Sequence, residues 1–322
     1  VSSALAHANS STIQIASGKR LKLESDFTVP EMKKMNITGS GGVLELGNSL
    51  TVEGTVEFAV PHTLNSGTVA LNGGSLNVKQ DLSVTSAVIH TVDSKIDVST
   101  GSTLTLTGGD INVGTKTITL SGGGIVANQG QLILNDPLSV LKLDGIGTVK
   151  NVSMPATLST GKLEVSENAI VQNLLNSGLS RVDILDSKTL SIENGFEIPQ
   201  AKSMEFIGDG GTLSLGDNMT VSGKLKFSSQ GLLKSGKVIL NQGILDVDQN
   251  ITVGSNLVHG ADSSIEIEDG KALSYTGEIF NIRDLTLKIS GGGKFENSNN
   301  LSLNDSKSKL QLDGTTISKV GI

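Results

Sequence analysis

The sequence predicts an all-β protein, a parallel β-helix (β-solenoid) of short strands, with a tandem internal repeat of 169 residues. Three observations lead to this prediction. Apolar and polar residues alternate with a period of two over stretches of three to six residues. Gly, Asn, Asp and Ser, which accept turn conformations, bound these stretches. The two halves of the chain also match each other without a gap.

The alternating stretches predict strands rather than helices. Residues 103–107 read TLTLT, residues 116–120 read KTITL and residues 285–289 read LTLKI. The best helix candidate, residues 168–179, is short and irregular. Strands this short bury little surface each, and a sandwich or barrel usually adds Trp or Tyr to its core, whereas this chain has no Trp and one Tyr. A solenoid instead stacks short strands around a narrow core, so a coil of about 20–28 residues predicts about six to eight coils per copy.

The tandem repeat predicts two copies of one structural unit. Residues 41–58 read GGVLELGNSLTVEGTVEF, and residues 210–227 read GGTLSLGDNMTVSGKLKF. The positions that define the repeat are Gly41, Gly42, Gly47, Gly54 and Phe58, with Gly210, Gly211, Gly216, Gly223 and Phe227. No residue is inserted or deleted between 11–153 and 180–322, which indicates turns that stack on turns. We expect a first copy over 1–169 and an incomplete second copy over 170–322 in one continuous solenoid, and a longer array stays open.

Phe and Asn residues suggest what lies inside the coil. Phe206 stands where the other copy has Ile37, and such an exchange is typical of an interior position. We therefore expect the seven Phe residues in the core. The recurring pairs Asn72/Asn241, Asn128/Asn297 and Asn135/Asn304 fit either side-chain amide stacks or left-handed turn residues.

Composition excludes several classes of protein. The formal net charge is −7 and Arg occurs three times, so the chain lacks the basic stripe that a nucleic-acid partner requires. No apolar run approaches the roughly 18 residues of a membrane-spanning helix. Cys is absent, which excludes disulfide scaffolds and Cys-ligated zinc sites.

The alternating Leu/Val/Thr strands, the Gly/Asn/Ser-rich turns and the lack of Cys resemble right-handed parallel β-helices of the bacterial surface adhesin and autotransporter-passenger type. The resemblance covers the whole chain but is one of style, because no specific family motif is matched. It implies an extracellular or cell-surface location and carries over no functional residue. The resemblance also covers enzymes with this fold, which carry a groove lined by clustered Asp, basic residues and aromatics. The sequence does not show this combination of residues.

Candidate chemistry rests on a few acidic and imidazole groups. His90 and Asp93 recur as His259 and Asp262, and this spacing could hold a metal or serve catalysis, but an ordinary strand-end His is the commoner reading. Calcium is the most plausible ion because its ligands are carboxylates and carbonyls. The candidate calcium ligands are Asp93, Asp262, Asp136, Asp305, Asp144 and Asp313. Solvated turn acids are the commoner reading of these residues, and we expect no catalytic residue and no cofactor.

The main functional prediction is a non-enzymatic extracellular structural or adhesive rod, fibre or stalk built from tandem solenoid repeats. Its partners would be other copies, end to end or laterally, or a host or cell-surface ligand. Two alternatives stay open: a glycan-binding or glycan-degrading β-helix protein, and a phage or virus fibre shaft.

Overall fold

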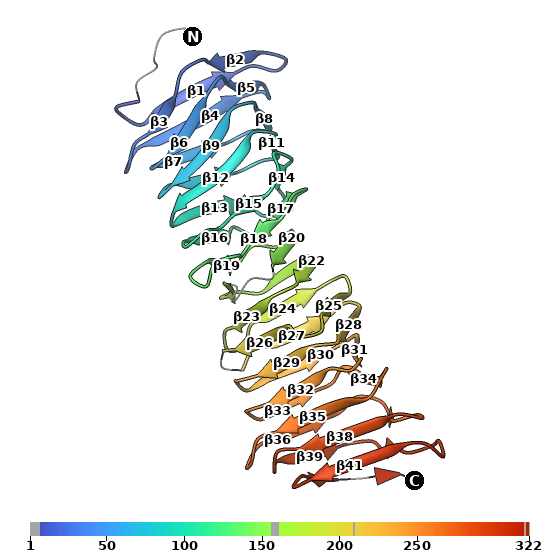
Figure 1. Ribbon diagram of the computed structural model, residues 1–322. Coiled ribbons are helices and arrows are strands. Elements are labelled where there is room, and N and C mark those ends of the chain that lie inside the picture. Colours follow the sequence, from blue (N-terminus) through green and yellow to red (C-terminus); the bar gives the residue numbers. More distant parts are fainter. Residues whose placement is uncertain (1–6, 156–160, 209, 319, 322) are drawn as a thin grey trace. The chain divides into compact units, whose positions relative to one another are not determined.

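The computed structural model describes residues 7–155, 161–208, 210–318 and 320–321. Within these ranges there is no helix, and parallel strands stack as a β-solenoid of about 14 turns (Figure 1). The predicted fold class is confirmed. The part of the chain that is described therefore holds no helix long and apolar enough to cross a membrane. The chain divides into two compact units, Val1–Ser153 with Gly161–Val171 and Met154–Thr160 with Gln172–Ile322.

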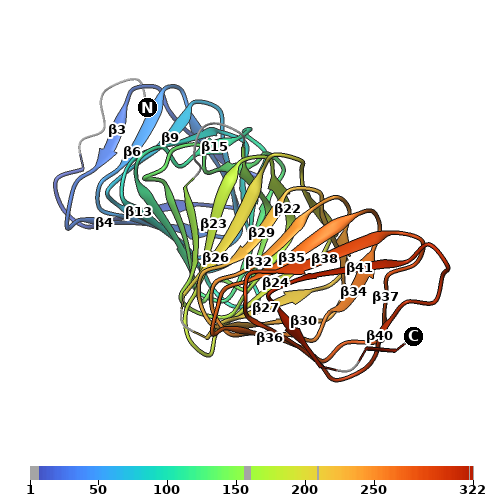
Figure 2. The same cartoon turned by 60° about the horizontal axis from the view of Figure 1, so that its bottom comes forward.

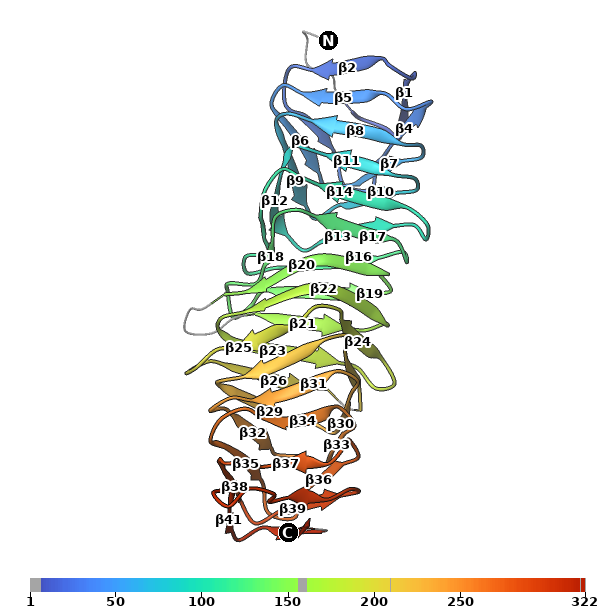
Figure 3. The same ribbon diagram turned by 90° about the vertical axis from the view of Figure 1, so that its right-hand side faces the viewer.

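Each turn of the first unit has up to three strands, which we assign to sides A, B and C. Side A consists of β1 (Ser11–Ile15), β4 (Lys34–Gly39), β7 (Thr55–Phe58), β10 (Ser75–Val78), β13 (Ser94–Val98), β16 (Thr117–Ser121), β19 (Val140–Asp144) and β21 (Lys162–Val165). Side B, stacked in Figure 3, consists of β2 (Arg20–Leu23), β5 (Val43–Leu46), β8 (His62–Asn65), β11 (Leu82–Val84), β14 (Thr103–Leu106), β17 (Ile125–Asn128) and β20 (Thr148–Met154). Side C, seen in Figure 2, consists of β3 (Phe27–Val29), β6 (Ser49–Val52), β9 (Thr68–Asn72) and β12 (Ala87–Val92), followed along the chain by β15 (Ile111–Asn112) and β18 (Leu132–Ile133).

The second unit repeats this plan. Its side A consists of β23 (Leu179–Ile184), β26 (Ser203–Ile207), β29 (Lys224–Phe227), β32 (Ile244–Val247), β35 (Ser263–Ile267), β38 (Thr286–Ser290) and β41 (Lys309–Asp313). Side B consists of β24 (Thr189–Ile192), β27 (Thr212–Leu215), β30 (Gly231–Lys234), β33 (Ile251–Val253), β36 (Ala272–Tyr275), β39 (Lys294–Asn297) and β42 (Thr316–Ile317). Side C consists of β25 (Phe196–Ile198), β28 (Asn218–Val221), β31 (Lys237–Leu240) and β34 (Asn256–His259), with β37 (Phe280–Asn281), β40 (Leu301–Ser302) and β43 (Val320–Gly321). β22 (Ala169–Asn176) contains the boundary between the units.

The strand bounds carry the sequence offset. Five side-A strands of the second unit begin and end 169 residues after their counterparts: β29 after β7, β32 after β10, β35 after β13, β38 after β16 and β41 after β19. Because both ends of each strand shift by the same amount, these strands of the two units occupy corresponding positions of the sequence repeat. The extension to whole domains over 1–169 and 170–322 remains a prediction.

The core is a set of columns of apolar side chains. Parallel pairing on side A brings Met35, Val56, Leu76, Ile96 and Leu120 into one column, and each is at most 1% exposed. Successive residues of a strand point to opposite faces, so the period of two turns the members of this column inward and the residues next to them in each strand outward. Burying an aliphatic side chain of this size contributes about 1.5–3 kcal/mol. Register is therefore strongly specified, since a slip by one residue would expose the whole column.

Glycines lie at the corners between the sides. Gly54 connects β6 to β7, and a Cβ built there would lie 2.2 Å from the carbonyl oxygen of Pro30 and 2.3 Å from that of Lys33. Its counterpart Gly223 meets the same contacts, at 2.2 Å from Pro199 and from Lys202. These glycines let the backbone of one turn pass directly over the backbone of the turn before. The repeat glycines Gly41, Gly42, Gly47, Gly210, Gly211 and Gly216 also lie at corners, and Phe58 and Phe227 lie inside.

The Phe prediction is confirmed, since all seven Phe side chains are buried. Phe206 and Phe227 stack with ring centroids 5.3 Å apart. Of the two readings of the Asn pairs, the left-handed one is wrong, because none of the six has a positive φ. Hydrogen bonds from side-chain amides do occur. The Asn128 Nδ2 donates to the Asn151 carbonyl at 2.7 Å, and the Asn151 Nδ2 donates to the Asn128 carbonyl at 2.6 Å. An interior amide can thus join two turns of the coil.

We predict that Gly54→Ala destabilises the protein by more than about 2 kcal/mol, because the added methyl group overlaps two carbonyl oxygens of the preceding turn. Gly254→Ala is the control, since its Cβ would meet its nearest atom, the Thr276 Oγ1, at 3.4 Å. Urea denaturation measures both. Equal stability of the two variants would contradict the close stacking of corners.

Candidate functional site

The six candidate calcium ligands lie apart and each meets a protein group. Asp93 and Asp262 follow side C, Asp136 and Asp305 lie in turns, and Asp144 and Asp313 end β19 and β41. Their partners are the amides of Thr117, Thr286, Leu138 and Lys307, the Ser166 hydroxyl and the Lys288 ammonium. Across the described ranges, no three His, Asp or Glu side chains gather as metal ligands. The structure therefore does not bring the predicted ligands together.

The recurrent His–Asp pair ties one turn to the next. The Asp93 Oδ1 accepts the Thr117 amide at 2.8 Å, and the Asp262 Oδ1 accepts the Thr286 amide at 2.7 Å. The His90 Nδ1 lies 3.0 Å from the Val113 carbonyl oxygen, and the His259 Nδ1 lies 3.0 Å from that of Ile282. Because a carbonyl oxygen only accepts, each Nδ1 carries the proton. Each pair thus bonds one amide and one carbonyl of the following turn.

Burial sets the protonation of these imidazoles. His259 is fully buried beside Phe280, and its Nε2 has no hydrogen-bond partner in the described part of the chain. Burial lowers the pKa of His259, and the hydrogen bond to the Ile282 carbonyl and the charge of Asp262 only partly oppose this. Burial likewise lowers the pKa of His90 and of His7. The neutral imidazole is therefore the form that the fold accommodates.

The first unit has a groove of about 550 Å³. It follows the corner between sides C and A over successive turns. Its lining, which we call the C–A groove, consists of Met32, Lys33, Lys34, Glu53, Gly54, Thr55, Gly73, Gly74, Ser75, Asp93, Ser94, Lys95, Thr117 and Thr119. All of these residues belong to the first unit.

One wall of the groove is a single register row on the outer face of side A. Lys34 pairs with Thr55, Thr55 with Ser75, Ser75 with Lys95 and Lys95 with Thr119. Adjacent rungs lie about 4.8 Å apart, so the row is about 19 Å long. It presents either a hydroxyl or an ammonium group at each rung. We call these five residues the outer row.

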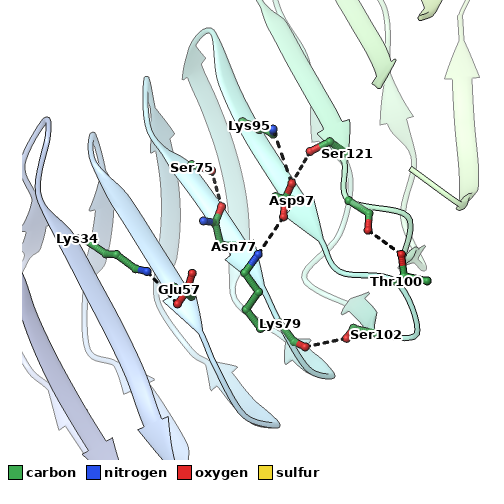
Figure 4. Close-up of polar contacts among 11 residues, drawn as sticks. Lys34, Glu57, Ser75, Asn77, Lys79, Lys95, Asp97, Thr100, Ser102 and Ser121 are labelled. Carbon is green, nitrogen blue, oxygen red and sulfur yellow. Dashed lines mark hydrogen bonds and ion pairs between the residues drawn. The ribbon is translucent and has the colours of Figure 1, made fainter. Parts of the chain in front are cut away.

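A second row, two residues further along each strand, carries acids that hold the lysines. The Lys34 Nζ lies 2.9 Å from the Glu57 Oε1, and the Lys95 Nζ lies 3.7 Å from the Asp97 Oδ2 (Figure 4). The Lys79 Nζ and the Ser121 Oγ also bind Asp97, at 3.4 and 2.7 Å. Burial alone would raise the pKa of Asp97, but the Ser121 hydrogen bond and the Lys79 charge outweigh it and keep this pKa below its usual range. Asp97 therefore stays ionised, and Glu57 and Asp97 orient the ammonium groups of Lys34 and Lys95.

The second unit has the same corners with a different lining. Gly54, Gly74, Asp93, Ser94 and Thr117 recur as Gly223, Gly243, Asp262, Ser263 and Thr286. The outer row instead becomes Ser203, Lys224, Ile244, Ser264 and Lys288, and Gln242 stands at the position of Gly73. The residues that shape the corner are kept, and those that face outward change.

Sequence reasoning missed this groove. Its signal is the spacing of Lys34, Thr55, Ser75, Lys95 and Thr119, at 21, 20, 20 and 24 residues. These spacings acquire meaning only when the length of each turn is known. The predicted site residues in the groove, Gly54 and Asp93, were assigned as a repeat position and a calcium candidate.

Comparison with known proteins assigns no family: no family model matches the chain, and no curated protein and no solved structure shows significant similarity to it.

We predict that Asp93→Ala lowers the free energy of unfolding by about 1 kcal/mol, because the Thr117 amide loses its acceptor. Asp93→Asn keeps an acceptor oxygen and should recover most of the loss. Thermal melts of the wild type and of Asp93→Asn, each with calcium and with a chelator, test whether Asp93 binds calcium. A midpoint that rises with calcium in the wild type, and no longer does so in Asp93→Asn, would contradict the structural role.

We also predict that the protein loses stability as the pH falls below the unfolded-state histidine pKa of 6.5. The folded-state pKa of His259 is lowered, so in this window the unfolded chain binds the additional proton. The contribution of each such histidine to the free energy of unfolding is fully present above pH 6.5. As the pH falls toward the folded-state pKa, this contribution decreases by up to about 1.4 kcal/mol per pH unit.

His259→Leu should flatten this pH dependence and should also lower stability at pH 7, since the Ile282 carbonyl loses its donor. Denaturation midpoints between pH 5 and 7.5 measure both effects. An unchanged slope in the variant would show that His259 is not buried as a neutral group.

Proposed function

We propose that this chain is a non-enzymatic structural or adhesive element at the cell exterior, of the kind that bacterial surface adhesins and autotransporter passengers build from β-helices. The observation that carries the proposal is that recurring His and Asp side chains form hydrogen bonds between turns. The His90–Asp93 and His259–Asp262 pairs bond the following turn in both units. Side chains that could serve catalysis thus join one turn to the next, as a stiff stalk requires.

The outer face of side A supports the adhesive part of the proposal. Its Lys, Thr and Ser side chains stand in register at every rung, and the strands that hold them are paired on both sides. A surface of this kind is fixed before a ligand arrives, so little ordering opposes binding. Rigid presentation is what a stalk-borne contact surface needs.

The C–A groove also favours a second candidate, a glycan-binding β-helix protein. The degrading form of that candidate needs two convergent acids with separated pKa values. The acids of the groove are Glu53 and Asp93, and they accept the Asn72 side-chain amide and the Thr117 backbone amide. These contacts favour binding over hydrolysis.

Beads coated with the chain test the proposal, with albumin-coated beads as the control. We expect retention under flow on cell monolayers or on surfaces coated with extracellular polysaccharide, and no release of reducing or unsaturated sugar ends from the same material. Concentration-dependent filaments in electron micrographs would support the structural part. Release of sugar ends would contradict the proposal, and so would beads that do not adhere together with a chain that does not assemble.

A further inference from the structure

We propose that the C–A groove of the first unit binds a linear anionic glycan, with carboxylate or sulfate groups that meet Lys34 and Lys95. This inference rests on the adhesive function proposed above and names its ligand. Four properties of the groove lead to it: its length, the bonding of its backbone, its charge and the nature of its lining.

The groove suits an extended ligand with a repeating structure. The outer row runs about 19 Å over five rungs and offers Lys, Thr, Ser, Lys and Thr in turn. Lys34 and Lys95 stand three rungs apart, about 14 Å, with two hydroxyl groups between them. A compact ligand could not reach both lysines, whereas a chain of several sugars lies along all five rungs.

The backbone of the groove has few donors to offer to a peptide. The amides of Thr55, Ser75 and Lys95 donate to carbonyl oxygens of the preceding turn, at 2.8, 2.8 and 3.1 Å. The Gly73 amide donates to the Ser94 Oγ at 3.0 Å, and the Thr117 amide to Asp93. A peptide that adds as a strand needs free main-chain groups at a sheet edge. Recognition in this groove therefore relies on side-chain hydroxyl and ammonium groups, which suit a polyhydroxylated chain.

The charge of the lining favours an anion. Among the lining residues, three lysines, Lys33, Lys34 and Lys95, outnumber two acids, Glu53 and Asp93. Two further acids outside the lining, Glu57 and Asp97, contact Lys34 and Lys95 from the second row. The side chains of Lys34 and Lys95 are 42% and 46% exposed although each contacts an acid. An ammonium has three donors, so each lysine keeps donors for a ligand. Charge-assisted bonds to carboxylate or sulfate are the strongest that it can make.

The lining argues against an apolar ligand. Among the fourteen residues that line the groove, none is aromatic, and Met32 is the one large apolar side chain. Pockets for apolar small molecules are lined mainly by hydrophobic and aromatic groups. The second unit, with Ile244 in place of Ser75 and Gln242 in place of Gly73, provides the natural comparison.

The second unit also supplies substitutions that this fold already accommodates. Lys34→Ser with Lys95→Ser installs the residues found at Ser203 and Ser264 and removes both charges. Gly73→Gln installs the residue found at Gln242, which has a φ of 66°, close to the 89° of Gly73. A Cβ at Gly73 would meet only the Val92 Cγ1, at 3.7 Å, so the side chain enters the groove without a change in charge. Lys22→Ser, on side B, copies Ser191 and is the control for the loss of one positive charge outside the groove.

Calorimetric titration of the full chain tests the proposal with four probes. They are a heparin hexasaccharide, a polygalacturonate hexamer, neutral maltohexaose and a poly-glutamate decamer, each at low and high salt. We expect the heparin hexasaccharide, the polygalacturonate hexamer or both to bind at least about tenfold more tightly than maltohexaose and poly-glutamate. The affinity of this binding should fall as the salt concentration rises. Binding of polygalacturonate would show that carboxylates suffice, whereas binding of the heparin hexasaccharide alone would show that sulfate is required.

The double lysine variant and Gly73→Gln should each weaken this binding at least about tenfold, because one removes two charge-assisted bonds and the other fills the groove. Lys22→Ser should change it less than about twofold. Circular dichroism melts check that each variant folds. If the double lysine variant does not fold, Gly73→Gln alone still tests the proposal.

Several outcomes would overturn the inference. They are equal binding of poly-glutamate or maltohexaose, unchanged binding by Gly73→Gln, or an equal loss in Lys22→Ser. Adhesion of chain-coated beads without binding of either anionic glycan would also overturn it while leaving the proposed function in place. Failure of the beads to adhere is a failure of the proposed function itself.

Discussion

The parallel pairing of each turn with the next, in register, is the interaction on which the rest of the structure depends. It places Met35, Val56 and Leu76 in one buried column and Lys34, Thr55 and Ser75 in one half-buried outer row. Since side chains alternate between faces, the register that buries the column also fixes the row. The same pairing requires that corners stack closely, which is why Gly54 carries no side chain. Core, corner and outer surface follow from one constraint.

That constraint explains how much of the fold could be predicted from the sequence. The alternation in residues 116–120 predicted a strand, and β16 spans Thr117–Ser121. The exchange of Phe206 with Ile37 predicted an interior position, and both side chains are buried. Residues 168–179, the best helix candidate, contain the strand β22 instead. The recurring Asn residues fitted either side-chain amide contacts or left-handed turns, and the structure decides between the two. At Asn128 the φ is not positive, and its side-chain amide donates a hydrogen bond to the Asn151 carbonyl of the next turn.

The candidate site was harder to predict, because it arises between turns and not along the chain. The spacing of His90 and Asp93 allowed a metal or catalytic pair beside the commoner reading of an ordinary strand-end His. In the structure both residues contact the following turn, at Val113 and Thr117. The groove gathers residues 20 to 24 positions apart, and no local pattern marks them. The two units show which residues shape the corner: Gly54 and Asp93 recur in the second unit, whereas Ser75 and Lys95 do not. A stable scaffold with a variable outer row can present different surfaces from one fold.

The central claim is that neighbouring turns pair in register on side A, and the absence of Cys allows a direct measurement. Cys residues introduced at Thr55 and Ser75 can each carry a nitroxide spin label. Because these positions are register partners on adjacent rungs about 4.8 Å apart, the account predicts a spectrum dominated by spin exchange. Labels at Thr55 and Lys95, two rungs apart, should show weaker coupling. A spectrum of two independent nitroxides for the adjacent pair would contradict the register, and with it both the core column and the groove.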